Sequence, residues 1–335
     1  MRLDDPAAGP GSDADNATIP VIGAAETRRA LPFDALILAL KAAFAADATV
    51  PERHHHHIQG PGGDGVLLLM PAWNAGMLGT KIATVFPGNS GRGLPSVYSI
   101  YLLADAATGA PVALLDGNEI TTRRTIAVSA LAASFLARED ASDLLVVGAG
   151  RIAALAASAF AAVRPIRRVA VWNRDGAKAE RLVAELLAAG FEATAATSIE
   201  EAAARADIIS CATPSTAPII RGDWLRPGAH LDLIGSFTPA MREADDTCFA
   251  RGRIYVDTRD ALVEAGDLAG PIAAGVITPD DIQGSLADLC AGCARGRTSA
   301  DEVTIFKSVG TALADLAAAT LIHAHRGTPG ARDRG

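Results

Sequence analysis

The residues best placed to do chemistry begin with a glycine-rich turn, Gly148-Ala-Gly-Arg-Ile-Ala153, which follows the apolar run Leu144–Val147. In such a turn the first glycine permits a tight bend, the second lets an anion approach the backbone, and the small third residue lets a helix pack on the sheet. The positive end of that helix faces the phosphates of a dinucleotide. Alanine-rich chains also produce this spacing by chance, so a purely structural turn is the alternative. The strand before it and a second strand about twenty residues later favour a dinucleotide site on Gly148 and Gly150.

The tip of that second strand, Trp172-Asn-Arg-Asp175, bears on which dinucleotide is bound. Sites for NAD usually place an acidic residue there, where it binds the ribose 2′-hydroxyl. Here Asn173 is neutral, and Arg174 is a cation that suits a 2′-phosphate. We therefore expect NADPH to be preferred, with NADH possible. In the alternative interpretation Arg174 is a solvated loop residue and Asp175 binds the ribose.

Three cations of the N-terminal third are candidates for holding an anionic substrate: Arg53, Lys81 and Arg124. Lys81 stands among apolar residues of an expected strand, so its ammonium must face solvent or serve a buried anion. Arg124 falls in the first turn of a helix expected to begin at Thr122, where positive charge is unfavourable unless an anion is held there. Each alone is best explained as a surface charge. Together, between a sheet and the dinucleotide site, they predict a carboxylate pocket.

Histidines and cysteines offer further chemistry. The run His54–His57 suggests a metal site, but alternate side chains of an extended segment point to opposite faces. A proton donor or substrate contact from this run, assigned to His54, is favoured over a metal ligand. Cys290 and Cys293 form a single C-x-x-C at the expected end of a helix over Leu286–Arg295. We expect reduced thiols there rather than a redox or zinc site, and no metal site elsewhere.

The elements that must position these residues differ along the chain. Residues 1–17 are rich in Asp, Ala, Gly and Pro and are expected to form a disordered tail. An amphipathic helix over Pro32–Ala46 follows, and then a set of strands of which the last two form a hairpin through Asp105–Gly109. These strands are expected over Val66–Pro71, Gly79–Phe86, Ser96–Ala104 and Pro111–Asp116.

After a long helix over Thr122–Ala137, short apolar strands alternate with helices, the pattern of a parallel sheet covered on both faces. Strands are expected over Asp143–Val147, Arg168–Trp172, Ala206–Ala212, His230–Ile234 and Arg253–Asp257, and helices from the glycine turn through Val163 and over Gly176–Ala189 and Phe306–His323. The sequence therefore predicts an α/β protein with a Rossmann-type doubly wound parallel sheet over residues 129–311. An α+β substrate-binding and dimerisation domain with mostly antiparallel sheet is expected over residues 18–128 and 312–335, the last helix crossing back to it.

Length and composition agree with this division and exclude some functions. The 335 residues exceed the usual size of one domain, and half of them are hydrophobic, as in a compact globular protein. The net charge of −8 argues against a nucleic-acid partner. No apolar stretch approaches the roughly 20 residues that span a bilayer, and no signal peptide is visible. We expect a cytoplasmic protein without a membrane partner.

The chain resembles the ornithine cyclodeaminase/mu-crystallin family over about residues 32–319. The resemblance is carried by Gly79-Thr-Lys-Ile with Phe86-Pro-Gly-Asn89, Ile120-Thr-Thr-Arg-Arg-Thr125, Gly148-Ala-Gly150, and Ser308-Val-Gly-Thr-Ala-Leu-Ala-Asp-Leu316. It implies that Arg53, Lys81 and Arg124 bind the substrate carboxylate, Arg124 also lying close to the cofactor. It implies cofactor contacts by Ser96, by Arg151 and Ile152 at the pyrophosphate, Asn173 at the ribose, Thr213 on the adenosine side, and Ser308 and Val309 beside the nicotinamide. It also implies a homodimer, with the N-terminal domain and the C-terminal helix at the interface.

One departure from the family pattern bears on the reaction. Cyclodeaminases carry an aspartate after a Gly-Gly pair, and this chain has Ser236 or Phe237 at that point, neither of which can act as a carboxylate base. Ile234-Gly-Ser-Phe-Thr-Pro-Ala-Met-Arg-Glu243, Val163-Arg-Pro-Ile-Arg-Arg168 and Arg53-His-His-His resemble the branch of Δ1-pyrroline-2-carboxylate reductases. That branch implies NAD(P)H-dependent formation of L-proline in hydroxyproline breakdown. Δ1-Piperideine-2-carboxylate, reduced to L-pipecolate, is implied as a second substrate.

The candidate residues suit such a cyclic ketimine acid. Arg124 can hold its carboxylate with a two-pronged guanidinium and Lys81 can add a point charge, which fixes C2 under the nicotinamide. Hydride transfer to a protonated imine needs no strong base, so loss of the aspartate is compatible with catalysis. His54 or Ser236 is expected to protonate or hydrogen-bond the imine nitrogen. The alternatives are an ornithine cyclodeaminase, an enzyme like alanine dehydrogenase, and a non-catalytic NADPH-dependent ligand carrier.

Overall fold

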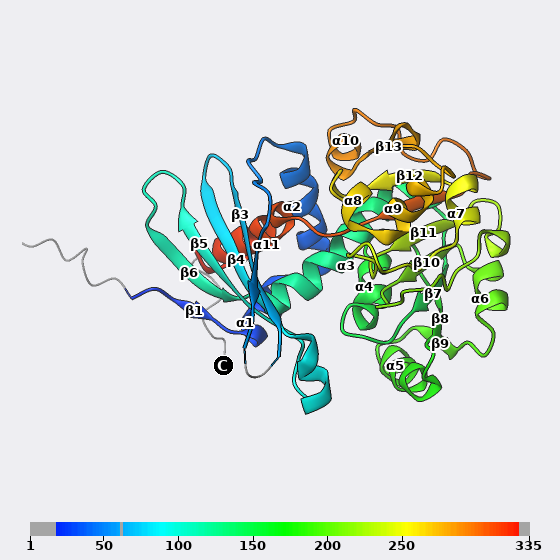
Figure 1. The fold of residues 1–335 in the computed structure, drawn as a ribbon, viewed down its shortest axis with the longest axis horizontal. Coiled ribbons are helices and arrows are strands. Elements are labelled where there is room, and N and C mark those ends of the chain that lie inside the picture. Colours follow the sequence, from blue (N-terminus) through cyan, green and yellow to red (C-terminus); the bar gives the residue numbers. More distant parts are fainter. Residues whose placement is uncertain (1–17, 61–62, 328–335) are drawn as a thin grey trace, which may run out of the picture.

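The protein is built on two sheets that lie side by side in Figure 1. The computed structural model describes residues 18–60 and 63–327. The strand order is β1-β6-β5-β4-β3-β2 in the N-terminal, six-stranded sheet and β13-β12-β14-β11-β10-β7-β8-β9 in the eight-stranded sheet. The tail predicted for residues 1–17 lies outside the described residues.

The six-stranded sheet is antiparallel except that β1 pairs in parallel with β6. Its strands are β1 Val21–Ile22, β2 His54–Ile58, β3 Gly65–Trp73, β4 Met77–Val85, β5 Val97–Asp105 and β6 Pro111–Asp116. The four strands predicted from the sequence are confirmed, and β1 and β2 are additional. β2 was missed because four consecutive histidines show no alternation of apolar and polar residues.

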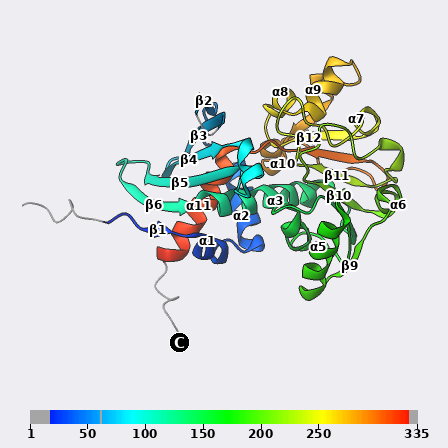
Figure 2. The same cartoon turned by 60° about the horizontal axis from the view of Figure 1, so that its bottom comes forward.

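Three helices lie on one side of this sheet, as Figure 2 shows for α1 and α11. They are α1 Ala24–Ala30, α2 Phe33–Ala45 and α11 Ala312–Gly327. The apolar stripe predicted for α2 is buried, with Leu36 and Leu40 fully so. Helix α11 crosses back to β3 and β4 as predicted. It begins at Ala312 rather than Phe306, because Phe306 belongs to a strand of the other sheet.

All strand pairs of the eight-stranded sheet are parallel, so the predicted α/β fold with a Rossmann-type sheet is confirmed. Its strands are β7 Asp143–Val147, β8 Arg168–Trp172, β9 Glu192–Ala195, β10 Ile208–Cys211, β11 His230–Leu233, β12 Arg253–Val256, β13 Ile282–Ser285 and β14 Thr304–Lys307. Its helices are α4 Ala156–Ala161, after a 3₁₀ turn over Ala153–Leu155, α5 Gly176–Ala188, α6 Ile199–Arg205, α7 Asp246–Arg251, α8 Ala261–Glu264, α9 Gly266–Ala273 and α10 Leu286–Cys290. Strands β9, β13 and β14 were not predicted. Among the described helices, none is long and apolar enough to cross a membrane.

Helix α3, Gly117–Leu136, connects the two sheets and packs against both. It begins at Gly117 rather than at the predicted Thr122, because the Asp116 carboxylate accepts a hydrogen bond from the Glu119 N–H at 2.7 Å and caps the helix. Arg124 therefore lies beyond the first turn, and the predicted clash of its charge with the helix dipole is wrong. The expected boundary between residues 128 and 129 falls inside this helix.

Candidate active site

A cavity of about 490 Å³ is lined by residues of both sheets. One part of its wall comes from β3, β4, β5 and α3. The other part comes from the loops that follow β7, β10, β11 and β14, the carboxyl ends of four parallel strands. Ligands of open α/β sheets bind at these ends. The cavity is therefore the candidate active site.

Two of the predicted cations, Lys81 and Arg124, meet in this wall on a buried carboxylate. Nζ of Lys81 lies 2.7 Å from Oδ2 of Asp315, and Nε of Arg124 lies 2.8 Å from Oδ1. Asp315 is fully buried on α11, and both cations are at most 5% exposed. Sequence reasoning missed Asp315. The available signal was a lone charge in a stretch of helix, Ala312–Ile322, that is otherwise uncharged.

The charges in this cluster leave a net positive wall at neutral pH. Burial lowers the pKa of Lys81 to about 8, against the attraction of Asp315 and with the repulsion of Arg124. Although burial alone would raise it, Arg124 and Lys81 hold the pKa of Asp315 below its usual value. Lys81 and Arg124 are then positive and Asp315 is negative. The surplus of one positive charge suits a monoanionic carboxylate.

The third predicted cation, Arg53, reaches the same cavity from the segment before β2. Its Nη2 donates a hydrogen bond to the carbonyl oxygen of Gly310 at 2.7 Å. The same nitrogen lies 3.4 Å from Oε2 of Glu264. The structure thus brings Arg53, Lys81 and Arg124 together as predicted, with Arg53 partly neutralised by Glu264.

A turn after β14 fits tightly against Arg124. Gly310 has φ +84°, and a Cβ there would lie 2.8 Å from Nη1 of Arg124. The Asp257 carboxylate fixes this turn by accepting hydrogen bonds from the N–H groups of Val309 at 3.0 Å and Gly310 at 2.7 Å. Ser308 and Val309, predicted beside the nicotinamide, both line the cavity.

The predicted glycine turn forms another part of the wall. Gly148 has φ +115°, and a Cβ there would lie 2.8 Å from the carbonyl oxygen of Ala212, so the position requires glycine. A Cβ at Gly150 would meet nothing within 4 Å. Gly150, Arg151 and Ile152 line the cavity. The open space above Gly150 fits a pyrophosphate that approaches the backbone.

A buried glutamate ties together the loops that follow β10 and β11. Oε1 of Glu243 accepts hydrogen bonds from the N–H and Oγ1 of Thr213 at 2.7 and 2.8 Å, and Oε2 accepts one from the N–H of Gly235 at 2.6 Å. Burial raises the pKa of Glu243 to about 7, although the Lys307 cation opposes this. Thr213, predicted on the adenosine side of the cofactor, is therefore held by a residue that sequence reasoning did not single out.

Asn173 and Arg174, predicted on the ribose side of the cofactor, do not line the cavity. Asn173 donates a hydrogen bond to the carbonyl oxygen of Asp175 at 2.9 Å, and Arg174 is exposed. The Asp175 side chain caps α5. Ser96 does not line the cavity, and Ser99 of β5 does so in its place.

Ser236 does not line the cavity either, because its side chain is turned into the protein. Its Oγ donates to the carbonyl oxygen of Met241 at 2.6 Å and accepts from the N–H of Asp267 at 3.2 Å. Its neighbour Phe237 lines the cavity instead. Of the two residues at the position of the expected base, the one that lines the cavity is thus an apolar ring.

The pairing of β2 contradicts the prediction that His54 reaches the site. His54 pairs with Leu69, whereas Lys81 pairs with Met70, the next residue of β3. Because successive side chains of a strand point to opposite faces, His54 and Lys81 lie on opposite faces of the sheet. His55 shares the face of Lys81 but is exposed and does not line the cavity.

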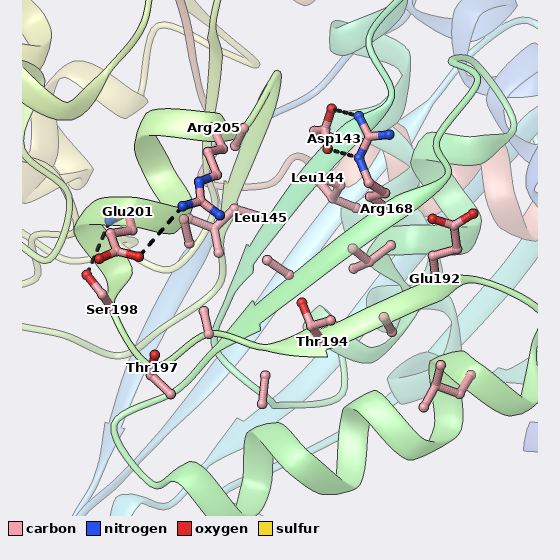
Figure 3. A pocket seen from close by; sticks show the side chains of 18 residues that line it. Asp143, Leu144, Leu145, Arg168, Glu192, Thr194, Thr197, Ser198, Glu201 and Arg205 are labelled. Atoms are coloured by element: carbon pink, nitrogen blue, oxygen red, sulfur yellow. Dashed lines mark hydrogen bonds and ion pairs between the residues drawn. The ribbon is translucent and has the colours of Figure 1, made fainter.

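A larger hollow of about 530 Å³ beside α6, drawn in Figure 3, is less suited to chemistry. Four of its labelled charges form ion pairs, Asp143 with Arg168 and Glu201 with Arg205. Asp143 and Arg168 begin their strands, so this hollow reaches the amino ends of β7 and β8. Ligands of this fold bind at the carboxyl ends.

The thiols and potential metal ligands form no further site within the part of the chain that the structure describes. Cys290 is half-buried and Cys293 is exposed, and both are free thiols. In residues 18–60 and 63–327, no group of three or more His, Cys, Asp or Glu side chains is arranged to hold a metal ion.

Comparison with known proteins identifies the family. Residues 21–327 match the model of the ornithine cyclodeaminase/mu-crystallin family. A Delta(1)-pyrroline-2-carboxylate reductase of Colwellia psychrerythraea is 38% identical over 306 residues, 89% of this chain and 96% of the relative. Another from Paracoccus denitrificans is 43% identical over 261 residues, 77% and 83% of the two chains. The structure of Thermococcus litoralis Delta(1)-pyrroline-2-carboxylate reductase in complex with NADH and L-proline superposes with a TM-score of 0.86 at 32% identity, covering 91% of this chain and 97% of the other. The chain belongs to the ornithine cyclodeaminase/mu-crystallin family.

Proposed function

We propose that the chain reduces Δ1-pyrroline-2-carboxylate to L-proline with a nicotinamide dinucleotide as hydride donor. The observation that carries this proposal is the cavity in which Lys81 and Arg124 share a wall with the Gly148–Gly150 turn. The two curated relatives are reductases of this acid, and the solved structure holds NADH and L-proline. Δ1-Piperideine-2-carboxylate, giving L-pipecolate, is proposed as a second substrate, and hydroxyproline breakdown as the context. A cytoplasmic location stays a prediction of the sequence.

The positive wall binds and orients the substrate carboxylate. Nε of Arg124 donates its hydrogen bond to Asp315, so the terminal nitrogens Nη1 and Nη2 are the ones that bind the two oxygens of the substrate carboxylate. Lys81 adds a point charge beside them. Fixing the carboxylate in this way sets the position of the neighbouring imine carbon. Holding the reacting carbon in a fixed orientation accelerates the reaction.

The remaining wall suits the ring of the substrate and the dinucleotide. Apolar side chains of β3 and β4, Leu68, Ala83 and Val85, face the cavity and exclude water from the reacting carbon. The bound cofactor supplies the hydride. Gly150, Ser308 and Val309 line the space that would hold it, and exposed Arg174 supports a preference for NADPH, since Asp175 is used to cap α5.

The cavity argues against cyclodeamination as the reaction. Of the described residues that line it, none is acidic, and Phe237 stands beside the position of the missing base. A deamination that starts from an amine needs a group to take up protons, whereas reduction of a protonated imine does not. Reduction of a ketimine is therefore the better match.

We also propose a homodimer formed through the open face of the six-stranded sheet. Leu69, Ile82 and Ile100 are cross-strand partners on the face opposite Lys81, and Ile100 is 50% exposed. Apolar surface of this kind commonly marks a protein interface. Helix α11 packs on the other face, so the interface proposed here is the sheet and not that helix.

The experiment is a spectrophotometric assay of NADPH and NADH oxidation with enzymatically generated Δ1-pyrroline-2-carboxylate. We expect turnover by the wild type. In Lys81→Ala and in Arg124→Ala, kcat/KM should fall roughly 10- to 150-fold, because a charged hydrogen bond contributes about 1.5–3 kcal/mol. Lys41→Ala, at an exposed lysine of α2, is the control that should keep kcat/KM. Proline release from ornithine without turnover of the ketimine would overturn the proposal.

A further inference from the structure

We propose that Asp315 is a positioning residue of the active site, which keeps Lys81 charged and aims Lys81 and Arg124 at the substrate carboxylate. This inference rests on the proposed ketimine reduction. Asp315 does not line the cavity, whereas Lys81 and Arg124 both do. Any effect of Asp315 on the substrate must therefore pass through these two cations.

The geometry joins three elements that are distant in the sequence. One carboxylate on α11 bonds Lys81 of β4 through one oxygen and Arg124 of α3 through the other, at 2.7 and 2.8 Å. Asp315 is fully buried, so no solvent competes for either oxygen. The carboxylate thereby holds Lys81 by its only side-chain nitrogen, Nζ, and Arg124 by Nε. Removing a partner of a buried charge leaves an uncompensated charge, which is strongly unfavourable.

The groups that face Lys81 show why its charge depends on Asp315. Arg124 on α3 and Arg53 before β2 both repel its ammonium, and burial disfavours it further. Tyr101 on β5 is the cross-strand partner of Lys81. Burial and Asp315 raise the pKa of Tyr101 well above its usual value, so this ring stays neutral. Asp315 is the group in contact with Lys81 that favours its charged form.

The protonation of Lys81 is sensitive to its surroundings near neutral pH. The pKa of Lys81 is about 8 with Asp315 in place. Without that carboxylate the remaining influences of burial, Arg124 and Arg53 all lower it. Lys81 then loses its proton near or below neutral pH and no longer attracts an anion.

The test is the pH dependence of carboxylate binding, measured by isothermal titration calorimetry on the NADPH-loaded full chain. The probe is pyrrole-2-carboxylate, a planar five-membered-ring acid whose nitrogen does not titrate near neutral pH. Lys81 attracts an anion only while protonated, so binding is present below its pKa and is lost as pH rises through it. Wild type should lose affinity above about pH 8. In Asp315→Asn this loss should move to lower pH by at least about one unit, with an affinity at pH 7 at least about tenfold weaker.

Three further variants separate positioning from a structural role. Lys81→Arg keeps its charge at all these pH values and should abolish the loss, alone and combined with Asp315→Asn. Asp257→Asn removes another buried carboxylate, one that holds the turn at Val309 and Gly310, and should not move the loss. Asp315→Glu, which keeps the charge but displaces it, should retain the loss near pH 8 with weaker binding; it also serves if Asp315→Asn does not fold.

The outcomes are distinct from those of the proposed reaction. A folded Asp315→Asn protein with an unmoved pH dependence overturns the role of Asp315, as does Asp315→Glu with wild-type affinity. Calorimetry needs no turnover. If Asp315→Asn shifts the binding profile and no ketimine is reduced, the proposed function fails and the positioning role stands.

Discussion

Replacing Gly310 with alanine tests whether the turn after β14 positions Arg124 for the substrate. With φ at +84°, Gly310 adopts a backbone conformation that costs an L-residue about 1–2 kcal/mol. The added Cβ would lie 2.8 and 3.1 Å from Nη1 and Nη2 of Arg124, so the guanidinium must move. A charged hydrogen bond to the substrate is worth about 1.5–3 kcal/mol, and about 1.4 kcal/mol corresponds to a factor of ten. We therefore expect kcat/KM for the ketimine to fall roughly 10- to 150-fold.

The matched control for this experiment is Gly275→Ala. Gly275 has φ +69°, and a Cβ there would meet nothing within 4 Å, so this variant carries the backbone cost alone. Both proteins should melt about 2–8 °C below wild type, as a loss of 1–2 kcal/mol predicts. The assays are steady-state oxidation of NADPH and thermal unfolding followed by fluorescence. If Gly310→Ala melts lower but keeps the wild-type kcat/KM, as Gly275→Ala should, the turn does not position Arg124.

Arg174→Ala should weaken NADPH binding by about tenfold and leave NADH binding nearly unchanged, because the exposed guanidinium is proposed to pair with the 2′-phosphate. Fluorescence titration with both cofactors measures this, and an equal effect on both contradicts the preference for NADPH. Ile100→Glu, on the open face of the six-stranded sheet, should yield a monomer in light scattering after size-exclusion chromatography. Leu38→Glu, at an exposed leucine of α2, should remain dimeric; a dimeric Ile100→Glu protein argues against this interface.

Two kinds of pattern led to correctly predicted elements. One is the helical stripe of α2, and the other is the short apolar run between turn residues, as in β3 and β7. The last two residues of β14, Phe306 and Lys307, were assigned to the helix predicted over Phe306–His323, because a short apolar run fits both structures. The start of α3 was misplaced because Asp116, which ends β6, is also the cap of the helix.

The predicted cations that the structure brings together in the cavity are residues that lack an obvious reason in their local sequence. Lys81 among apolar neighbours had to face solvent or a buried anion, and together with Arg53 and Arg124 it led to the prediction of a carboxylate pocket. Its protein partner Asp315 was not found, because an acidic residue on a helix is ordinarily solvated. His54 was assigned to the site by its place in the chain, but the face of a strand depends on register, and a shift of one residue reverses it.

The distribution of carboxylates around the candidate active site explains why this cavity favours imine substrates over amine substrates. Asp315, Asp257 and Glu243 all lie close to the cavity, yet each accepts hydrogen bonds from protein groups and none lines the wall. An amine substrate entering this space meets cations and apolar side chains, with no described group to take up its proton. A cyclic imino acid brings its own positive charge, which disappears when the hydride arrives at carbon. The absence of an acidic side chain at Ser236 or Phe237 therefore obstructs reactions that begin from an amine. It does not obstruct the reduction of a ketimine, which needs cations that bind the carboxylate and apolar side chains that exclude water.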